Sequence, residues 1–205
     1  MFDILKARAQ QGCRTMRYPA GPAPELPARF VGRPTVDASR CPDGCRACAA
    51  RCPTGAITVD AAAERVRLDM GRCLFCGDCC AACPSQSIKF GRDHRLAAGR
   101  REDLGVESDV NRIGAAFKQE VAARFGRSLK LREVSAGGCN ACEADTNVLG
   151  TIAWDLGRFG IQFVAAPRHA DGLLITGPVT ENMRLALQKT YEAVPAPKIV
   201  IAVGS

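Results

Sequence analysis

The sequence predicts two domains of different fold class, a small α+β domain organised around cysteines and then an α/β domain with a parallel sheet. The first prediction rests on two runs of four cysteines within residues 36–92, each closed by proline and followed by a short apolar strand. The second rests on residues 129–205, where apolar strands alternate with helical segments in the pattern typical of a parallel sheet.

The composition limits the classes of function. The chain has 205 residues, 47% of them hydrophobic and 5% aromatic, which is enough for one or two aliphatic cores. Twelve cysteines without a signal-peptide pattern favour a reducing compartment and metal ligation, and no apolar run reaches the length of a membrane span. The net charge of +7 is spread along the chain, so we expect no nucleic acid partner. An anionic partner subunit, a membrane surface and a plain solvated surface all fit this charge.

Eight of the cysteines fall into two runs that each end in Cys-Pro. The second run has the spacing C-x2-C-x2-C-x3-C-P of bacterial ferredoxins, in which three cysteines hold one 4Fe-4S cluster and the fourth reaches to the other cluster. The first run has the same spacing with one extra residue after its first cysteine. Soft thiolates suit iron–sulfur clusters, so we predict two 4Fe-4S clusters. The two runs consist of Cys41, Cys45, Cys48 and Cys52, and of Cys73, Cys76, Cys79 and Cys83.

This spacing predicts ligand sets that cross between the runs. One cluster would be held by Cys41, Cys45, Cys48 and Cys83. The other would be held by Cys73, Cys76, Cys79 and Cys52. Zinc is the alternative because paired CxxC units also bind it, although zinc does not explain two four-cysteine runs closed by proline. Disulfides are a weaker alternative, because nothing marks a small secreted domain. Gly44 can absorb the extra residue of the first run by adopting a positive φ, which keeps Cys41 as a ligand.

Residues 1–35 are expected to form an amphipathic helix over 1–16 and a proline-rich strap. Such a basic helix can lie on a membrane surface, dock on a partner or pack on its own domain. Its apolar positions at helical spacing are Phe2, Leu5, Ala9 and Cys13.

Residues 36–92 repeat internally as cysteine loop, short helix and strand. Residues 56–59 and 65–68 are predicted to pair as a hairpin near Asp60. Cys80 falls outside the ligand spacing and is predicted to be a small buried thiol. The apolar side chains expected to line the clusters and exclude water are Ile57, Val59, Val66, Leu68, Ile88 and Phe90.

Residues 93–128 read as a charged linker, with His94 in a solvated loop, followed by a helix over 109–125. In residues 129–205 the pattern predicts strands at 129–134, 161–165, 172–177 and 198–204. It also predicts one helix that continues through Trp154 and Leu156, and another over 180–194. Ligands of parallel sheets bind beyond the carboxyl ends of the strands, here the loops after Val134, Gly177 and Val203.

Cys139 and Cys142 stand on the first of these loops, after two glycines and before Glu143. A single CxxC is also compatible with a redox dithiol or with half of a zinc site. In a chain that already carries two cluster motifs, a third 4Fe-4S cluster is the favoured interpretation.

Both halves of the chain resemble known families. Residues 1–92 resemble the ferredoxin-type subunit of formate hydrogenlyase and its relative in respiratory complex I. The resemblance rests on Thr15-x2-Tyr18-Pro19, Phe30-x-Gly32-x-Pro34 and GRCLFCGDC at 71–79. Residues 129–205 resemble the small subunit of NiFe-hydrogenases and the 20 kDa-type subunit of complex I. Here the matching stretches are GGCNACE at 137–143, PRHADGLLITGPVT at 167–180 and PKIVIAVGS at 197–205.

The resemblance implies a fusion of two subunits of a membrane-bound, group 4 hydrogenase-like complex. A bacterial ferredoxin-like α+β domain would be followed by a flavodoxin-like α/β domain. The function implied is an iron–sulfur electron relay between a donor and a nickel–iron large subunit, on the cytoplasmic face of the inner membrane as a peripheral oxidoreductase subunit. The implied partners are this large subunit and membrane subunits, with quinone or ferredoxin as redox partner. Bond chemistry would occur in the large subunit.

Two alternatives remain open. One is the electron-transfer subunit of a complex I-like NADH/quinone oxidoreductase, although complex I uses adjacent cysteines where this chain has Cys139-x2-Cys142. The other is a soluble, diffusing ferredoxin with an appended domain.

The resemblance also implies roles for single residues. Glu143 matches a glutamate implicated in proton transfer, although a carboxylate at a helix N-terminus is an equal interpretation. Arg168 and His169 match a region that approaches quinone or the large subunit, although structural loop roles are equally compatible. In the family two further cysteines follow the Gly-Ser of the last strand, whereas this chain ends at Ser205 and offers two ligands for a third cluster.

Overall fold

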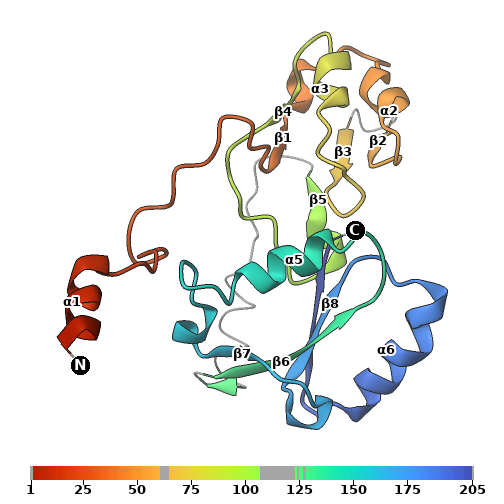
Figure 1. Ribbon diagram of the computed structural model, residues 1–205. Helices are drawn as coiled ribbons and strands as arrows, with labels where there is room; N and C mark the ends of the chain where they lie inside the picture. Colours follow the sequence, from red (N-terminus) through yellow and green to blue (C-terminus); the bar gives the residue numbers. More distant parts are fainter. Residues whose placement is uncertain (1, 61–64, 107–122, 124, 127, 205) are drawn as a thin grey trace. The chain divides into compact units, whose positions relative to one another are not determined.

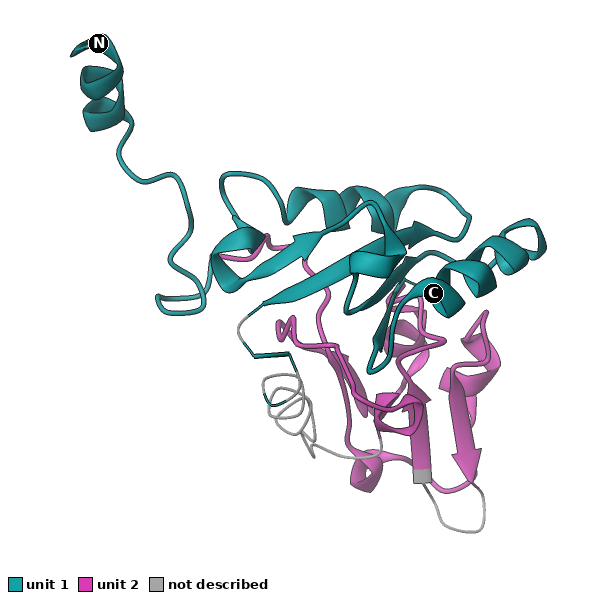
Figure 2. Cartoon of the chain, turned by 90° about the horizontal axis from the view of Figure 1, so that it is seen from below, with its two compact units in different colours: residues 1–24, 121–205 teal, residues 25–120 magenta. Residues whose placement is uncertain are grey.

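The computed structural model of the protein describes residues 2–60, 65–106, 123, 125–126 and 128–204. The chain divides into two compact units, coloured separately in Figure 2. Glu25–Glu120 form the cysteine unit, and Met1–Pro24 together with Val121–Ser205 form the α/β unit. The helix predicted over 109–125 lies outside the described residues except at positions 123 and 125.

The cysteine unit contains short strands and two single-turn helices that follow the cysteine loops (Figure 1). The strands are β1 (Pro34–Val36), β2 (Ile57–Asp60), β3 (Arg65–Asp69), β4 (Ile88–Phe90) and β5 (Gly105–Val106). The helices are α2 (Ala47–Arg51) and α3 (Asp78–Ala82), with 3-10 turns η1 (Ala38–Arg40) and η2 (Arg101–Leu104). The predicted hairpin is confirmed, because β2 and β3 are antiparallel with Ile57 opposite Leu68.

Strand pairings at long range complete this unit. The end of the proline-rich strap forms β1 and pairs antiparallel with β4, so that Val36 stands opposite Ile88. Residues 101–106, which the charged sequence pattern indicated as linker, add η2 and β5 to the hairpin, with Val106 opposite Leu68. Val106 is buried. Part of the charged segment therefore belongs to the structured unit.

The core of the cysteine unit contains the apolar side chains predicted to line the cysteines. Leu68 and Ile88 are fully buried, at 0% and 2% exposure. Ile57 and Val66 are buried with them, and Val59 and Phe90 pack against this core while partly exposed. Cys48 and Cys79 are part of the same core, so the unit buries its thiols together with its aliphatic side chains.

The α/β unit has a four-stranded, all-parallel sheet in the order β7-β6-β8-β9. If these four strands are numbered 1 to 4 along the chain, their order in the sheet is 2-1-3-4. This is the first part of the 2-1-3-4-5 order of one common doubly wound fold. The strands are β6 (Leu129–Ser135), β7 (Ile161–Phe163), β8 (Gly172–Thr176) and β9 (Ile199–Val203). The helices are α1 (Phe2–Gln11), α5 (Ala141–Val148) and α6 (Glu181–Ala193), with 3-10 turns η3 (Leu156–Phe159) and η4 (Pro167–His169).

One face of the sheet is covered by α6, whose Met183 and Leu187 pack against Val134 and Leu173. Because strand residues alternate between faces, Leu131 and Glu133 point to the opposite face.

Three helix and strand boundaries differ from the predictions by two residues or more. The helix predicted through Trp154 and Leu156 is wrong in length, because α5 ends at Val148 and the N–H of Gly150 bonds the Asn147 carbonyl in a turn. The second strand of the sheet ends at Phe163 instead of residue 165. The N-terminal helix ends at Gln11, and Gly12 follows with a positive φ of 61°.

Within the α/β unit, the start of the strap is hydrogen-bonded to the segment around η3. The N–H of Met16 donates to the Ala153 carbonyl at 2.8 Å. The guanidinium of Arg158 donates to the carbonyls of Met16 and Tyr18. By contrast, none of the residues of α1 is buried, and Phe2 and Ile4 are strongly exposed. Among the described helices, none has the length and apolar character needed to cross a membrane.

Candidate metal centre

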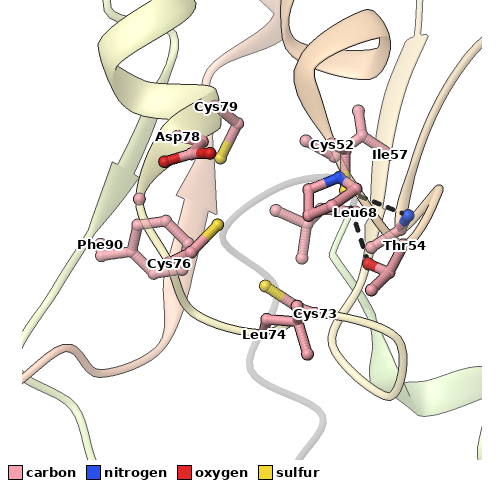
Figure 3. Close-up of a pocket in the computed structure, with 13 residues that line it drawn as sticks. Cys52, Thr54, Ile57, Leu68, Cys73, Leu74, Cys76, Asp78, Cys79 and Phe90 are labelled. Atoms are coloured by element: carbon pink, nitrogen blue, oxygen red, sulfur yellow. Dashed lines mark hydrogen bonds between the residues drawn. The ribbon is translucent and has the colours of Figure 1, made fainter.

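Four thiols from both cysteine runs line one pocket of the cysteine unit (Figure 3). The pocket encloses about 320 Å³, part of it open to solvent. The apolar part of the wall includes Ile57, Leu68, Leu74 and Phe90. The four thiols belong to Cys52, Cys73, Cys76 and Cys79.

A second group of thiols consists of Cys41 and Cys48 of the first run together with Cys83 of the second run. Burial is the main cause that raises the pKa of the Cys48 thiol, and the nearby Cys83 and Cys41 thiolates raise it further. Cys83 belongs to the second run, yet it lies close to the first, as Cys52 lies close to the second. This grouping is the one that crossed ligand sets require. The individual ligand assignments, that of Cys45 included, stay predictions.

The two Cys-Pro loops have the same local geometry. The N–H of Ala56 donates to Sγ of Cys52 at 3.3 Å, and the N–H of Ser87 donates to Sγ of Cys83 at 3.2 Å. In each loop the third residue after the cysteine has a positive φ, 61° at Gly55 and 51° at Gln86. This turn points backbone donors at the sulfur, which favours the thiolate.

Hydrogen bonds lower the pKa of both crossing cysteines. Burial raises the pKa of Cys83, but the Ser85 hydroxyl and the N–H groups of Ser87 and Ile88 outweigh it and bring the pKa to about 7. At Cys52, burial also raises the pKa, while the backbone N–H groups of Thr54, Ala56 and Ile57 favour the thiolate, and the pKa lies below the usual value. Both sulfurs are therefore prepared to bind as thiolates.

The extra residue of the first run is absorbed as predicted. Gly44 has φ of 70°, a conformation that glycine adopts without strain. In the second run Phe75 has φ of 55°, and its N–H donates to Sγ of Cys73 at 3.3 Å. Gly77 of the second run also has a positive φ, of 82°, so both loops contain left-handed turns, and in the longer loop a glycine accommodates it.

The more deeply buried thiols have raised pKa values, so a positively charged metal centre is needed to hold them as thiolates. Burial raises the pKa of Cys73, and with the neighbouring Cys80 it raises the pKa of Cys79 to about 12. Metal ligation removes such protons, because the ion stabilises the thiolate. All twelve cysteines are unpaired, which excludes the disulfide alternative for this structure.

In the described parts of the chain, no three Cys, His, Asp or Glu side chains are close enough to share a single ion. The preference for a cluster over zinc therefore rests on the cysteine spacing, which zinc does not explain. Cys80 is partly exposed, where the sequence predicted a buried thiol, and it packs against the core beside Cys79.

Three hydroxyl side chains at the crossing cysteines were not predicted from the sequence, those of Thr54, Ser85 and Ser87. Thr54 lies 3.6 Å from Sγ of Cys52, and Ser85 lies 3.6 Å from Sγ of Cys83. The signal was present in the internal repeat, because Cys-Pro-Thr and Cys-Pro-Ser place a hydroxyl at the same position of each loop.

A second candidate site lies at the carboxyl edge of the parallel sheet in the α/β unit. Cys139 and Cys142 follow β6, with Cys139 exposed and Cys142 half-buried. The loop after β9 reaches this site, because a Cβ added at Gly204 would lie 2.5 Å from Sγ of Cys142. The loop after β8 also approaches, and the N–H of Thr180 donates to the Ala136 carbonyl at 3.0 Å. The three loops that the sequence placed at the carboxyl ends of the strands therefore lie close together.

A pair of carboxylates lies near these cysteines. Glu143 is in the first turn of α5, as the helix-terminus interpretation expected. Glu133 lies on β6, and burial followed by the charge of Glu143 raises its pKa. Its Oε1 is buried and bonds none of the described residues.

The structure does not bring Arg168 and His169 to this edge. They form η4, and the chain then enters β8 at the amino-terminal side of the sheet, where the N–H of Asp171 donates to the Lys130 carbonyl. Cys139 and Cys142 follow the carboxyl end of β6 instead.

Two family models match the chain. A 4Fe-4S dicluster domain matches residues 40–87, and the 20 Kd subunit of NADH ubiquinone oxidoreductase matches residues 139–205. The chain thus combines an iron–sulfur dicluster domain with a 20 kDa-type domain, and the resemblance stated from the sequence is confirmed.

The chain is similar to subunits of several redox complexes. The chain is 45% identical over 81 residues to the probable membrane-bound hydrogenase subunit mbhJ of Pyrococcus furiosus, covering 40% of this chain and 48% of the relative. It is 40% identical over 102 residues to formate hydrogenlyase subunit 7 of Escherichia coli, covering 50% and 40%. It is 43% identical over 68 residues to a subunit of the NADH-quinone oxidoreductase of Geotalea daltonii, covering 33% and 40%. The chain spans less than half the length of each of these relatives.

Proposed function

We propose that the chain is an iron–sulfur electron-transfer subunit of a membrane-bound hydrogenase-like complex, similar to formate hydrogenlyase. The observation that carries this proposal is the crossed grouping of thiols, with Cys52 beside the second run and Cys83 beside the first. The likeness to two hydrogenase subunits supports the choice of complex.

The residues of the cysteine unit hold and insulate two 4Fe-4S clusters. One cluster is held by Cys41, Cys45, Cys48 and Cys83, and the other by Cys73, Cys76, Cys79 and Cys52. Backbone N–H groups after each Cys-Pro stabilise the thiolates, and the aliphatic core keeps water from the sulfurs. When bound, such a cluster transfers single electrons, and the protein tunes its potential through hydrogen bonds, burial and charge.

The α/β unit carries the site to which the two clusters of the cysteine unit pass their electrons. Cys139 and Cys142 contribute two thiolates of a third 4Fe-4S site, whose other ligands come from outside the described residues. The unit is a flavodoxin-like domain, which the strand order supports, and its carboxyl edge faces a nickel–iron large subunit. Glu143 takes part in a proton route beside this site. Membrane subunits complete the complex, which is peripheral on the cytoplasmic face of the inner membrane.

The second candidate function is electron transfer to quinone in a complex I-like oxidoreductase, which the match of residues 139–205 favours. The Cys139-x2-Cys142 spacing favours the hydrogenase, since complex I uses adjacent cysteines. Purification of the native complex distinguishes the two. A partner with nickel supports the first function, and a nickel-free partner that passes electrons to a quinone supports the second.

Iron analysis tests the relay itself. The anaerobically reconstituted chain should hold about eight iron atoms from two clusters, and more only if the third site is completed. Cys76→Ser should remove the paramagnetic signal of one cluster, whereas Cys80→Ser, its neighbour outside the ligand spacing, should leave both. Zinc in place of iron, or equal effects of the two variants, would overturn the proposal.

A further inference from the structure

The hydroxyl side chains beside the two crossing cysteines are bonded differently, although the loops that carry them are alike. Thr54 and Ser85 each stand two residues after their cysteine, with oxygen 3.6 Å from the sulfur. The partners of these hydroxyls decide which of them can donate to a thiolate. A thiolate has no proton and can only accept hydrogen bonds, so the hydroxyl must supply the proton.

At Cys83 the hydroxyl of Ser85 is free to donate. Its oxygen lies 2.7 Å from the oxygen of Ser87, whose side chain is buried at 2% exposure. When Cys83 is a thiolate, the chain of bonds has one consistent direction, from Ser87 to Ser85 and from Ser85 to the sulfur. The N–H of Ser87 donates to the same sulfur at 3.2 Å. Cys83 therefore has a hydroxyl donor in addition to its backbone donor.

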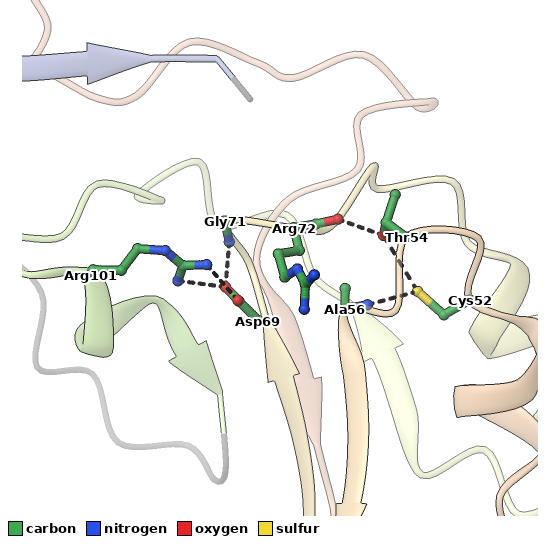
Figure 4. A network of polar contacts seen from close by, with 7 residues as sticks. All are labelled: Cys52, Thr54, Ala56, Asp69, Gly71, Arg72 and Arg101. Carbon is green, nitrogen blue, oxygen red and sulfur yellow. Dashed lines mark hydrogen bonds and ion pairs between the residues drawn. The ribbon is translucent and has the colours of Figure 1, made fainter. Parts of the chain in front are cut away.

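At Cys52 the proton of the hydroxyl is directed elsewhere. The Thr54 hydroxyl donates to the Arg72 carbonyl at 2.6 Å, a short bond to an atom that can only accept (Figure 4). A hydroxyl has one proton, so Thr54 presents only lone pairs to Cys52 once that sulfur is a thiolate. The contact between Cys52 and Thr54 is then favourable only while the sulfur carries its own proton and can donate it to the Thr54 oxygen. Cys52 keeps the backbone donor from Ala56 at 3.3 Å.

Resting on the proposed function, we infer that Ser85 raises the reduction potential of the cluster joined by Cys83, and that Thr54 does not do so for the cluster joined by Cys52. Reduction adds negative charge that spreads onto the ligand sulfurs, and a donated hydrogen bond stabilises this charge. Ser87 acts as a positioning residue, because its hydroxyl orients that of Ser85. The asymmetry gives the two internally repeated halves different affinities for an electron.

Redox titration of the full chain, followed by electron paramagnetic resonance under anaerobic conditions, tests this inference. Ser85→Ala should shift one midpoint potential downward, and Ser87→Ala should shift the same one by a smaller amount. Ser85→Thr keeps the hydroxyl and should restore the original value. The matched control is Thr54→Val, which removes the equivalent hydroxyl and should leave both midpoints in place. The cluster whose midpoint moves should be the one lost in Cys45→Ser.

The outcomes separate this inference from the proposed function. A wild-type chain without cluster signals would overturn both. Two normal clusters with midpoints that Ser85→Ala leaves unchanged would overturn only the inference, and so would equal shifts in Ser85→Ala and Thr54→Val. Iron content measured on each variant shows that a shifted midpoint comes from an intact cluster and not from partial loss of the cluster.

Discussion

Asp69 and Arg101 form a two-pronged ion pair, in which the two guanidinium nitrogens donate to the two carboxylate oxygens at 2.8 and 2.5 Å. Asp69 ends β3 and Arg101 begins η2, so the pair attaches the segment of β5 to the hairpin. The N–H of Gly71 adds a third bond to the same carboxylate (Figure 4). This contact joins a segment that carries no periodic pattern to the unit that holds the cysteines.

Arg101→Gln is expected to lower the stability of the cysteine unit. The hydrogen bonds from Arg101 hold the pKa of Asp69 below its usual value. A lowered folded-state pKa contributes stability above the unfolded pKa, and this contribution is lost as the pH falls through the folded value. Thermal unfolding of wild type and variant should therefore differ at neutral pH and converge in acid. A difference that persists unchanged in acid would contradict the role of this pair.

Glu133→Gln is expected to stabilise the α/β unit above the unfolded pKa of a carboxyl group. Burial and then Glu143 raise the pKa of Glu133, while Arg132 opposes them. A raised carboxyl pKa means that the folded state binds the proton more tightly, so stability falls as the pH rises from the unfolded to the folded pKa. The variant should lack this decline. Unfolding curves across this range should show the two proteins diverging as the pH rises, and a parallel course would refute the prediction.

Gly204→Ala is expected to disturb the site at Cys142. The residue has φ of 89°, and its added Cβ would lie 2.5 Å from Sγ of Cys142. The left-handed conformation alone costs roughly 1–2 kcal/mol for alanine, and the overlap adds to it. The measurement is the free energy of unfolding, together with the rate at which Cys142 reacts with an alkylating reagent.

Gly157→Ala serves as the control for this variant. Its added Cβ would come no closer than 3.8 Å to another atom, that of Asp155, and should change the stability by less than about 0.5 kcal/mol. Equal effects of the two substitutions would mean that Gly204 does not approach Cys142.

The sequence predicted the parts of the structure that depend on local pattern. Cysteine spacing indicated both thiol groups, the extra residue indicated the turn at Gly44, and apolar alternation indicated the hairpin and the parallel strands. The pairing of β1 with β4 and the addition of β5 were not predictable in this way. These strands have two or three residues each, too few for a period to appear, and their partners are distant in the chain.

The candidate site shows the same limit. Cysteine positions could be read directly, but the donors to their sulfurs depend on how the loops fold. Thr54 and Ser85 occupy equivalent places in the repeat, yet a contact with Arg72 separates their roles. The resemblance implied a role for Arg168 and His169 beside quinone or the large subunit, but their place in η4, just before β8, could not be predicted from the sequence. Such differences arise from tertiary contacts, which a single sequence does not display.

The crossing of the ligand sets is tested most directly by comparing four variants, Cys45→Ser, Cys76→Ser, Cys52→Ser and Cys83→Ser, by electron paramagnetic resonance after anaerobic reconstitution. The account predicts that Cys83→Ser loses the same cluster signal as Cys45→Ser, and that Cys52→Ser loses the same signal as Cys76→Ser. Loss of the Cys76 signal in Cys83→Ser would contradict it, because each cluster would then be held by a single run.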